Sequence, residues 1–194
     1  LCVVDGRLWL DGGGARRPLE LGGGEPTAAR FLADGGAVAT TTDDGGDHVV
    51  RFDRGLASLG RHAITGGAPA LDEAAGWAIV GAADQYLAIA PDGGARAVRP
   101  CAAGAAIRLI AADPASTAAD PAVVVWCSDG VLVTGGNGRE TRRHAPELEA
   151  RLPGAAVGVV VGQRLVVGGA DSRVGLVALP GGEELLWGVL TSLH

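Results

Sequence analysis

Aspartates recur in short glycine-rich turns along this sequence, and their type and spacing suggest chemistry before any other residues do. Most of them precede an apolar residue by two or three positions. Carboxylates gathered on neighbouring turns would form an acidic rim that attracts a cationic partner. The same side chains also accept hydrogen bonds from nearby backbone N–H groups and so shape tight turns. Both roles are open for Asp5, Asp44, Asp47, Asp84, Asp129 and Asp171.

The densest acidic segment runs from Asp43 to Asp47, and it is the strongest candidate for binding a partner. Carboxylates in a glycine-rich loop also suit calcium, a hard cation that prefers oxygen ligands. The EF-hand pattern is not met, because the twelfth position counted from Asp43 is Arg54 rather than glutamate. We therefore predict a protein contact at Asp43, Asp44 and Asp47, with calcium as the alternative.

One basic cluster comprises Arg142, Arg143 and His144, with Arg139 and Arg151 on either side. The planar guanidinium group donates hydrogen bonds in a fork that matches carboxylate and phosphate oxygens. The sequence places the cluster around a connection between two repeats. We predict that Arg142 and Arg143 contact a partner, with a solvated loop as the alternative.

Residue patterns of known catalytic sites do not occur in this sequence. No Gly-x-Ser-x-Gly segment is present, so no serine has the context of an activated nucleophile. The glycine clusters at 12–14 and 22–24 lack the Gly-Lys-Ser/Thr ending of a phosphate-binding loop. The histidines also lack a spacing suited to metal ligands; they are His48, His62, His144 and His194. We therefore expect no catalytic residue, no bound cofactor and no metal site.

The three cysteines, Cys2, Cys101 and Cys127, favour a reducing compartment. Their number is odd and no Cys-x-x-Cys pair occurs, which argues against a disulfide framework and against a zinc site. We therefore expect a cytoplasmic protein with free thiols.

Composition excludes several classes of protein. The chain has 194 residues, a net charge of -6 and 47% hydrophobic residues. A negative chain does not suit nucleic acid, which attracts clustered Lys and Arg. The apolar fraction is that of a packed domain rather than a disordered chain. The longest apolar segment, 155–161, is too short to span a bilayer. We expect one domain over residues 1–194 and no membrane span.

Short runs of Val, Leu, Ile and Ala alternate with Gly/Asp clusters, which is typical of an all-β protein. Helical periodicity is confined to one or two turns over residues 145–152. The main runs are 37–41, 49–52, 78–80, 86–90, 123–126, 131–134, 157–161, 165–167 and 174–179.

An internal repeat decides among the all-β architectures. Apolar anchors recur at intervals of about 40 residues, which is the length of one four-stranded propeller blade. They are Leu8, Val49, Leu87, Leu132 and Val174. The repeat predicts a partial blade at 1–24 and four full blades at 25–65, 66–100, 101–150 and 151–191. The turn aspartates would lie between the second and third strands of each blade. The four tryptophans would pack between blades.

Two segments resemble known propeller families. The segment 31–53, with Ala33-Asp34-Gly35-Gly36 and Phe52-Asp53, resembles a repeat of bacterial WD-repeat-like β-propellers. Phe52-Asp53 stands where that family often has Trp-Asp. The segment 182–187, which runs from glycine to tryptophan, is similar to the end of quinoprotein-type propeller repeats, a second choice. Both resemblances imply a β-propeller.

The first resemblance implies a non-catalytic scaffold that binds proteins through its loops. Similar bacterial propellers accompany kinases, ATPases or von Willebrand A proteins, so a partner of that kind is expected. One alternative is a propeller enzyme or quinoprotein with a ligand or metal in its central channel. Another is a purely structural domain. About four full blades and a partial one predict an incomplete ring, and hence sequence missing from one end.

Overall fold

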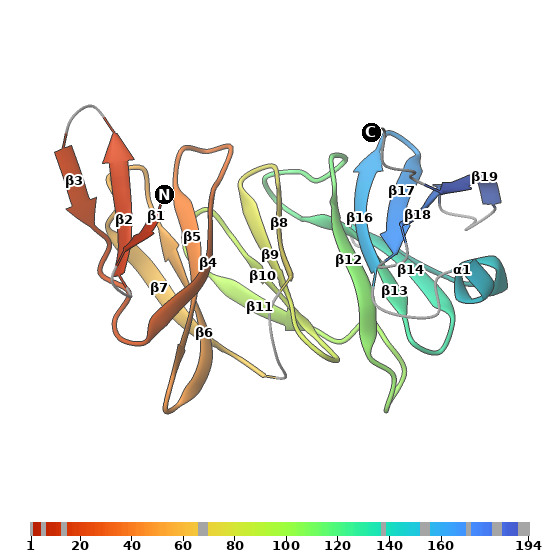
Figure 1. Cartoon of the computed structure of the whole chain (residues 1–194), viewed down its shortest axis with the longest axis horizontal. Helices are drawn as coiled ribbons and strands as arrows, with labels where there is room; N and C mark the ends of the chain where they lie inside the picture. Colours follow the sequence, from red (N-terminus) through yellow and green to blue (C-terminus); the bar gives the residue numbers. More distant parts are fainter. Residues whose placement is uncertain are drawn as a thin grey trace. The chain divides into compact units, whose positions relative to one another are not determined.

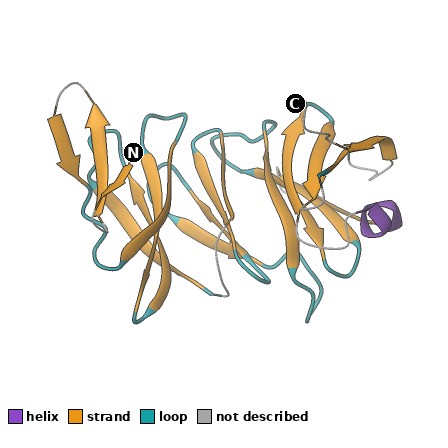
Figure 2. Ribbon diagram, in the orientation of Figure 1, coloured by secondary structure: helices purple, strands orange, loops and turns teal. Residues whose placement is uncertain are grey.

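Among the described residues, antiparallel β-strands form almost all of the regular secondary structure, and one short helix is present (Figure 2). The computed structural model describes residues 2–4, 7–12, 15–65, 70–136, 139–151, 156–169, 172–179 and 184–189. The chain divides into two compact units, Leu1–Val98 and Arg99–His194. The single domain expected over residues 1–194 stays a prediction.

The first unit contains three antiparallel sheets, each built from consecutive strands (Figure 1). The first sheet has three strands, namely β1 (Cys2–Val4), β2 (Arg7–Gly12) and β3 (Ala15–Pro18). The second sheet has β4 (Glu25–Phe31), β5 (Ala37–Asp43), β6 (Gly46–Phe52) and β7 (Ser58–Ile64). The third sheet has β8 (Ala70–Ala74), β9 (Trp77–Gly81), β10 (Tyr86–Ile89) and β11 (Ala95–Val98).

The second unit contains two four-stranded sheets of the same kind. The fourth sheet has β12 (Ile107–Asp113), β13 (Ala122–Cys127), β14 (Val131–Gly136) and β15 (Arg139–His144). Helix α1 (Pro146–Arg151) follows, as residues 145–152 predict. The fifth sheet has β16 (Ala156–Val161), β17 (Arg164–Gly169), β18 (Arg173–Ala178) and β19 (Glu184–Val189). Strands β12 and β16 lie side by side (Figure 1).

Asp-Gly turns explain why the chain reverses where it does. In each, the aspartate carboxylate accepts a hydrogen bond from the backbone N–H two residues later, and the glycine has a positive φ that other residues rarely adopt. The bonds measure 2.9 Å at Asp34, 2.9 Å at Asp92 and 3.2 Å at Asp129. The glycines are Gly35 (+83°), Gly93 (+90°) and Gly130 (+79°). Local turn chemistry thus sets the hairpin positions.

Apolar side chains bury the facing surfaces of neighbouring sheets within each unit. In the first unit, one core cluster joins the first and second sheets around Leu8 and Phe52. A second cluster joins the second and third sheets around Val38 and Ile89. In the second unit, a cluster between the fourth and fifth sheets includes Trp126 and, from α1, Leu148. These clusters stack sheet on sheet, as the repeat predicts.

Trp126 and Trp187 pack in the core between the fourth and fifth sheets, and Trp77 is buried within the first unit. Trp126 is 1% exposed, with the guanidinium of Arg108 at 5.2 Å from its ring centre. Trp77 is 8% exposed and lies beneath Arg96 at 5.6 Å. Trp187 packs partly buried against the core of the second unit. The arginines cover the ring faces, where a cation is attracted by the π-electrons.

One face of the fifth sheet is apolar and uncovered by the described residues. Val157 is 76% exposed, Val159 53% and Val161 60%, and the three alternate along β16. The register places Val159 opposite Val166, Val166 opposite Leu176 and Leu176 opposite Leu186, so an apolar row crosses all four strands. Such a face normally packs against another sheet.

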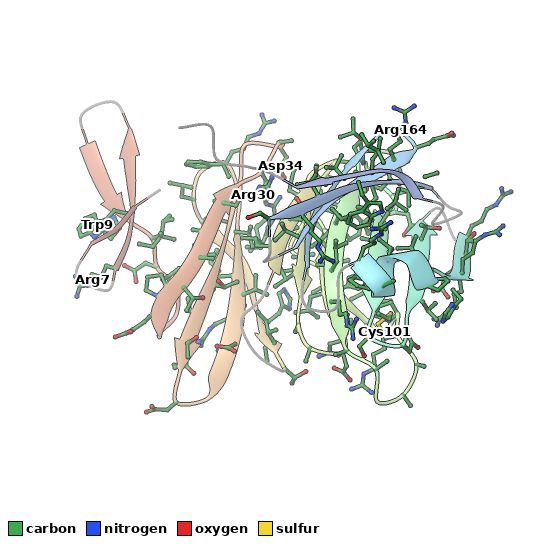
Figure 3. The ribbon with its side chains drawn as sticks, turned by 45° about the vertical axis from the view of Figure 1, so that its right-hand side comes forward. Arg7, Trp9, Arg30, Asp34, Cys101 and Arg164 are labelled. Carbon is green, nitrogen blue, oxygen red and sulfur yellow. A yellow bond between two sulfur atoms is a disulfide. The ribbon has the colours of Figure 1, made fainter. Side chains whose placement is uncertain are left out.

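The expectation of free thiols is wrong for two of the cysteines. Cys101 and Cys127 form a disulfide, with their Cα atoms 5.6 Å apart (Figure 3). Cys127 ends β13, and the antiparallel pairing of β12 with β13 sets Ile107 opposite it. The segment that precedes β12 therefore returns to the end of β13. The odd number of cysteines does not exclude a disulfide, because Cys2 belongs to the first unit. The second unit contains two cysteines, Cys101 and Cys127, which pair with each other.

Candidate functional site

The acidic turn, defined as Asp43, Asp44 and Asp47, connects two central strands of the second sheet. β5 ends at Asp43 and β6 begins at Gly46, and these two residues face each other in the ladder. Gly46 has a φ of +110°, which a residue with a side chain adopts only with strain. The turn therefore holds three carboxylates within five residues at one end of the sheet.

Asp43 is held in place by two hydrogen bonds that involve both of its carboxylate oxygens. The backbone N–H of Gly45 donates to Oδ1 at 2.8 Å, and Nη2 of Arg61 donates to Oδ2 at 2.5 Å. Nη1 of Arg61 also donates to the carbonyl of Gly22 at 3.2 Å. The Arg61 bond, then the Gly45 bond and the nearby His48, hold the pKa of Asp43 below its usual value. Asp43 therefore shapes the turn.

The carboxylates of Asp44 and Asp47 differ in their exposure to solvent and in their hydrogen bonds. Asp47 Oδ1 accepts a hydrogen bond from Oγ1 of Thr42 at 2.5 Å, and Asp47 is half-buried. Asp44 is exposed, and within the described part of the chain it makes no hydrogen bond or ion pair. Asp44 is thus the carboxylate best placed to meet a ligand, with Asp47 beside it.

A glycine segment, 22–24, lies against the acidic turn and supports it. A Cβ atom on Gly24 would stand 2.7 Å from the carbonyl oxygen of Thr42, closer than real Cβ contacts. Only glycine allows this approach. The sequence of this cluster lacks the ending of a phosphate loop and does not by itself predict another role. Its position before a strand, with three glycines in a row, was the signal for a close backbone contact.

Asp84 lies at the same end of the first unit as the acidic turn. Asp47 faces Ile64 across β6 and β7, so the next residue, Thr65, lies beside the turn. Oγ1 of Thr65 accepts a hydrogen bond from Nε2 of Gln85, in the turn between β9 and β10 that also contains Asp84. The second and third sheets therefore present their acidic turns on one side.

The remaining turn aspartates do not extend this group. Asp129 lies in the second unit, between β13 and β14, where its carboxylate accepts a hydrogen bond from Val131 N and shapes the turn. Asp5 and Asp171 lie outside the described residues. The acidic rim expected from six aspartates on five turns is therefore described only for the acidic turn and Asp84.

Arg142 and Arg143 lie in β15, the outer strand of the fourth sheet, and not in a loop. Nε of Arg142 donates to Oε1 of Glu140 at 2.6 Å, with both side chains 46% exposed. Arg143 is exposed. His144 at the end of β15 lies next to the Asp129 turn, since its Nε2 would be 3.2 Å from a Cβ on Gly130. The basic cluster is thus a charged sheet edge.

The described residues form a hollow but no group of side chains suited to a metal ion. A hollow of about 400 Å³ lies in the first unit, lined by Arg7, Leu8 and residues 18–24. Among the described residues, no three His, Cys, Asp or Glu side chains are grouped so that they could hold a metal ion. The helix in the described part of the chain is too short and polar to cross a membrane.

Replacing Arg61 by glutamine should raise the pKa of Asp43 toward its ordinary value, because the strongest hydrogen bond to the carboxylate loses its charge. In the native chain the pKa of Asp43 is lowered. The stabilising contribution of its carboxylate is therefore present above the unfolded pKa and disappears as the pH falls through the folded pKa. A ¹³C NMR titration of the carboxyl carbon, from pH 2 to pH 6, measures the shift. An unchanged titration curve in Arg61→Gln would refute the assigned cause.

Two solved structures share this arrangement of sheets. The β-propeller domain of Cps50 (Swd1) from Myceliophteria thermophila aligns over 88% of this chain and 58% of its own, with 17% identity and a TM-score of 0.59. BBS1N, in a crystal structure of its complex with ARL6DN, aligns over 96% of this chain and 59% of its own, with 18% identity and a TM-score of 0.60. The chain spans less than two thirds of either structure.

No family model matches the sequence, and no curated protein matches it. The structural likeness therefore carries the assignment of the fold. Each four-stranded sheet takes the place of a blade, and the three-stranded first sheet is the partial blade that the repeat predicts. The chain has the fold of a β-propeller, with neighbours of the WD40 type.

Proposed function

We propose that this chain is a non-catalytic scaffold that binds a protein partner through the loops of its propeller fold. The observation that carries the proposal is the acidic turn. It presents Asp44 exposed and Asp47 half-buried, on a turn held by Asp43, Arg61 and Gly24. A rigid turn with uncompensated charge loses little entropy on binding and attracts a cationic surface.

Two further observations support a binding role. Asp84 lies at the same end of the unit and adds a carboxylate to that surface. BBS1N, which shares the fold, is known in a complex with ARL6DN. From the resemblance to bacterial WD-repeat-like propellers, the partner would be a kinase, an ATPase or a von Willebrand A protein. Its contact surface would carry Lys or Arg opposite Asp44.

Replacing Asp44 and Asp47 together by asparagine should reduce capture of the partner. The purified chain is immobilised, exposed to lysate of its source cells at low salt, and the retained proteins are quantified by mass spectrometry. We expect at least one protein to fall about fivefold in the double variant, because rim charges mainly set the rate of encounter. Asparagine keeps the size of each side chain, so the turn should stay folded.

Asp92→Asn is the matched control, since Asp92 is also an exposed turn aspartate but lies between β10 and β11. This variant should retain the same proteins as the wild type. Equal loss in both variants would point to non-specific charge effects and would refute the role of the acidic turn. Retention of no protein above a blank matrix would favour a purely structural domain.

The cytoplasmic location expected from the sequence stays a prediction, and the disulfide argues against it. Disulfides persist in oxidising compartments and are rare where glutathione keeps thiols reduced. Cys127 is fully buried and paired with Cys101. A partner would then be met in an oxidising compartment. Trapping thiols with an alkylating reagent at the moment of cell lysis would show which state the native chain holds.

A further inference from the structure

Strand β15 forms an edge of the fourth sheet. It pairs with β14 along its whole length, from Gly136 opposite Arg139 to Val131 opposite His144. No strand of the described chain pairs with its other side. All of its residues except Thr141 are exposed. An edge of this kind offers unpaired backbone groups to any extended segment that fits beside it.

The register shows which backbone groups point outward. The N–H of Ala145, the next residue after β15, donates to the carbonyl of Gly130 at 2.9 Å. In an antiparallel ladder, residues that bond to the partner strand alternate with residues whose N–H and C=O point away. Residues 139, 141 and 143 therefore bond toward β14. The outward backbone groups belong to Glu140, Arg142 and His144.

The charged side chains of β15 determine which kind of segment can bind to its outward N–H and C=O groups. The strand carries three arginines and one glutamate, in a chain whose net charge is -6. Glu140 is paired with Arg142 on one face. Arg139 and Arg143 lie on the other face, on either side of Thr141, at a separation of about 13 Å along the strand. Another basic strand, such as β15 of a second copy of the chain, would be repelled. A segment with a carboxylate opposite each arginine would be attracted.

We propose that β15 binds an acidic, extended peptide segment of a partner protein, which adds to the fourth sheet as a further strand. Main-chain hydrogen bonds to Glu140, Arg142 and His144 hold the segment, and carboxylates four residues apart meet Arg139 and Arg143. This mode is strand addition at a sheet edge. The proposal deepens the scaffold role and rests on it, but it uses a different surface from the acidic turn.

A fluorescein-labelled, end-capped nonapeptide that alternates glutamate with valine is the probe, titrated against the whole chain by fluorescence anisotropy. Binding should weaken about fivefold in Arg139→Gln/Arg143→Gln, since two cross-strand charge pairs are lost. It should also weaken when sodium chloride is raised from 50 to 300 mM, since salt screens exposed charges. The same peptide with glutamine in place of glutamate should bind about fivefold more weakly to the wild type.

Two matched changes test the backbone contacts. Arg142→Pro removes an outward N–H without touching the ladder to β14, whereas Arg142→Thr keeps it. The proline variant should bind the peptide about fivefold more weakly than the threonine variant. A peptide N-methylated at its valines, which lie opposite Glu140, Arg142 and His144 and would donate to them, should lose binding to the unaltered chain. This keeps the test valid even if the proline variant unfolds.

No binding to the wild type at millimolar peptide would overturn the proposal. Equal binding of the N-methylated peptide, or competition by an oligonucleotide as strong as that by the acidic peptide, would also overturn it. Asp44→Asn/Asp47→Asn should leave peptide binding unchanged. If the wild type fails to bind the peptide but its capture of the partner still depends on Asp44 and Asp47, strand addition alone is refuted. If the wild type binds the peptide as expected but partner capture does not depend on Asp44 and Asp47, the role of the acidic turn alone is refuted.

Discussion

Replacing Asp34 by alanine should lower the free energy of unfolding by about 3 to 4 kcal/mol, the cost of leaving a buried cation without its partner. Arg51 lies on β6 with its side chain fully buried, and its Nη2 donates to Oδ2 of Asp34. The same Nη2 donates to the carbonyl of Gly76, in the turn between β8 and β9, at 3.3 Å. Urea unfolding followed by circular dichroism measures the loss.

Arg51→Met is the matched comparison for Asp34→Ala. It removes the buried charge and leaves Asp34, whose side chain is 29% exposed, in contact with water. Replacing a buried ion pair by an apolar side chain of similar size costs little. We expect a loss of about 1 kcal/mol for Arg51→Met. A loss as large as that of Asp34→Ala would show that Arg51 packing, and not its charge, stabilises the junction of the second and third sheets.

Removing the disulfide should lower the free energy of unfolding of the second unit by about 3.5 kcal/mol, because its separation of 26 residues closes a loop in the unfolded chain. The change is Cys101→Ser together with Cys127→Ser. For a unit of this size, such a loss lowers the melting temperature by roughly 15 to 25 °C. Differential scanning calorimetry measures the shift.

Reduction provides the control for the disulfide. Dithiothreitol should lower the melting temperature of the wild type to that of the double serine variant and should leave the variant unchanged. Thiol titration of the denatured, unreduced wild type should find one free thiol, from Cys2. Three free thiols, or a melting temperature insensitive to dithiothreitol, would contradict the pairing of Cys101 with Cys127.

Local patterns in the sequence predict much of the fold. Val49, Leu87, Leu132 and Val174 each lie on the third strand of a four-stranded sheet, as β6, β10, β14 and β18 show, and Leu8 lies on β2, the middle strand of the first sheet. The reason is that strand alternation and Asp-Gly turns act over a few residues. The same chemistry predicts where the turn aspartates lie between strands.

Contacts between distant residues could not be predicted in this way. Asp43 meets Arg61 from another strand, and Gly24 supports the same turn from before the sheet begins. Cys101 meets Cys127 only because β12 pairs with β13. Such pairs depend on register, which a single sequence does not reveal. A different reason applies to the basic cluster, which the sequence places in a connection. β15 contains no apolar run that would mark it as a strand.

Association kinetics of the captured partner test the central claim most directly. The partner identified by capture is purified, and its binding to immobilised wild type, Asp44→Asn/Asp47→Asn and Asp92→Asn is followed by biolayer interferometry at two salt concentrations. A scaffold that binds through the acidic turn predicts an association rate about fivefold lower for the double variant at low salt, and a smaller difference at high salt. Asp92→Asn should match the wild type. Equal rates for the wild type and the double variant at low salt would contradict the account.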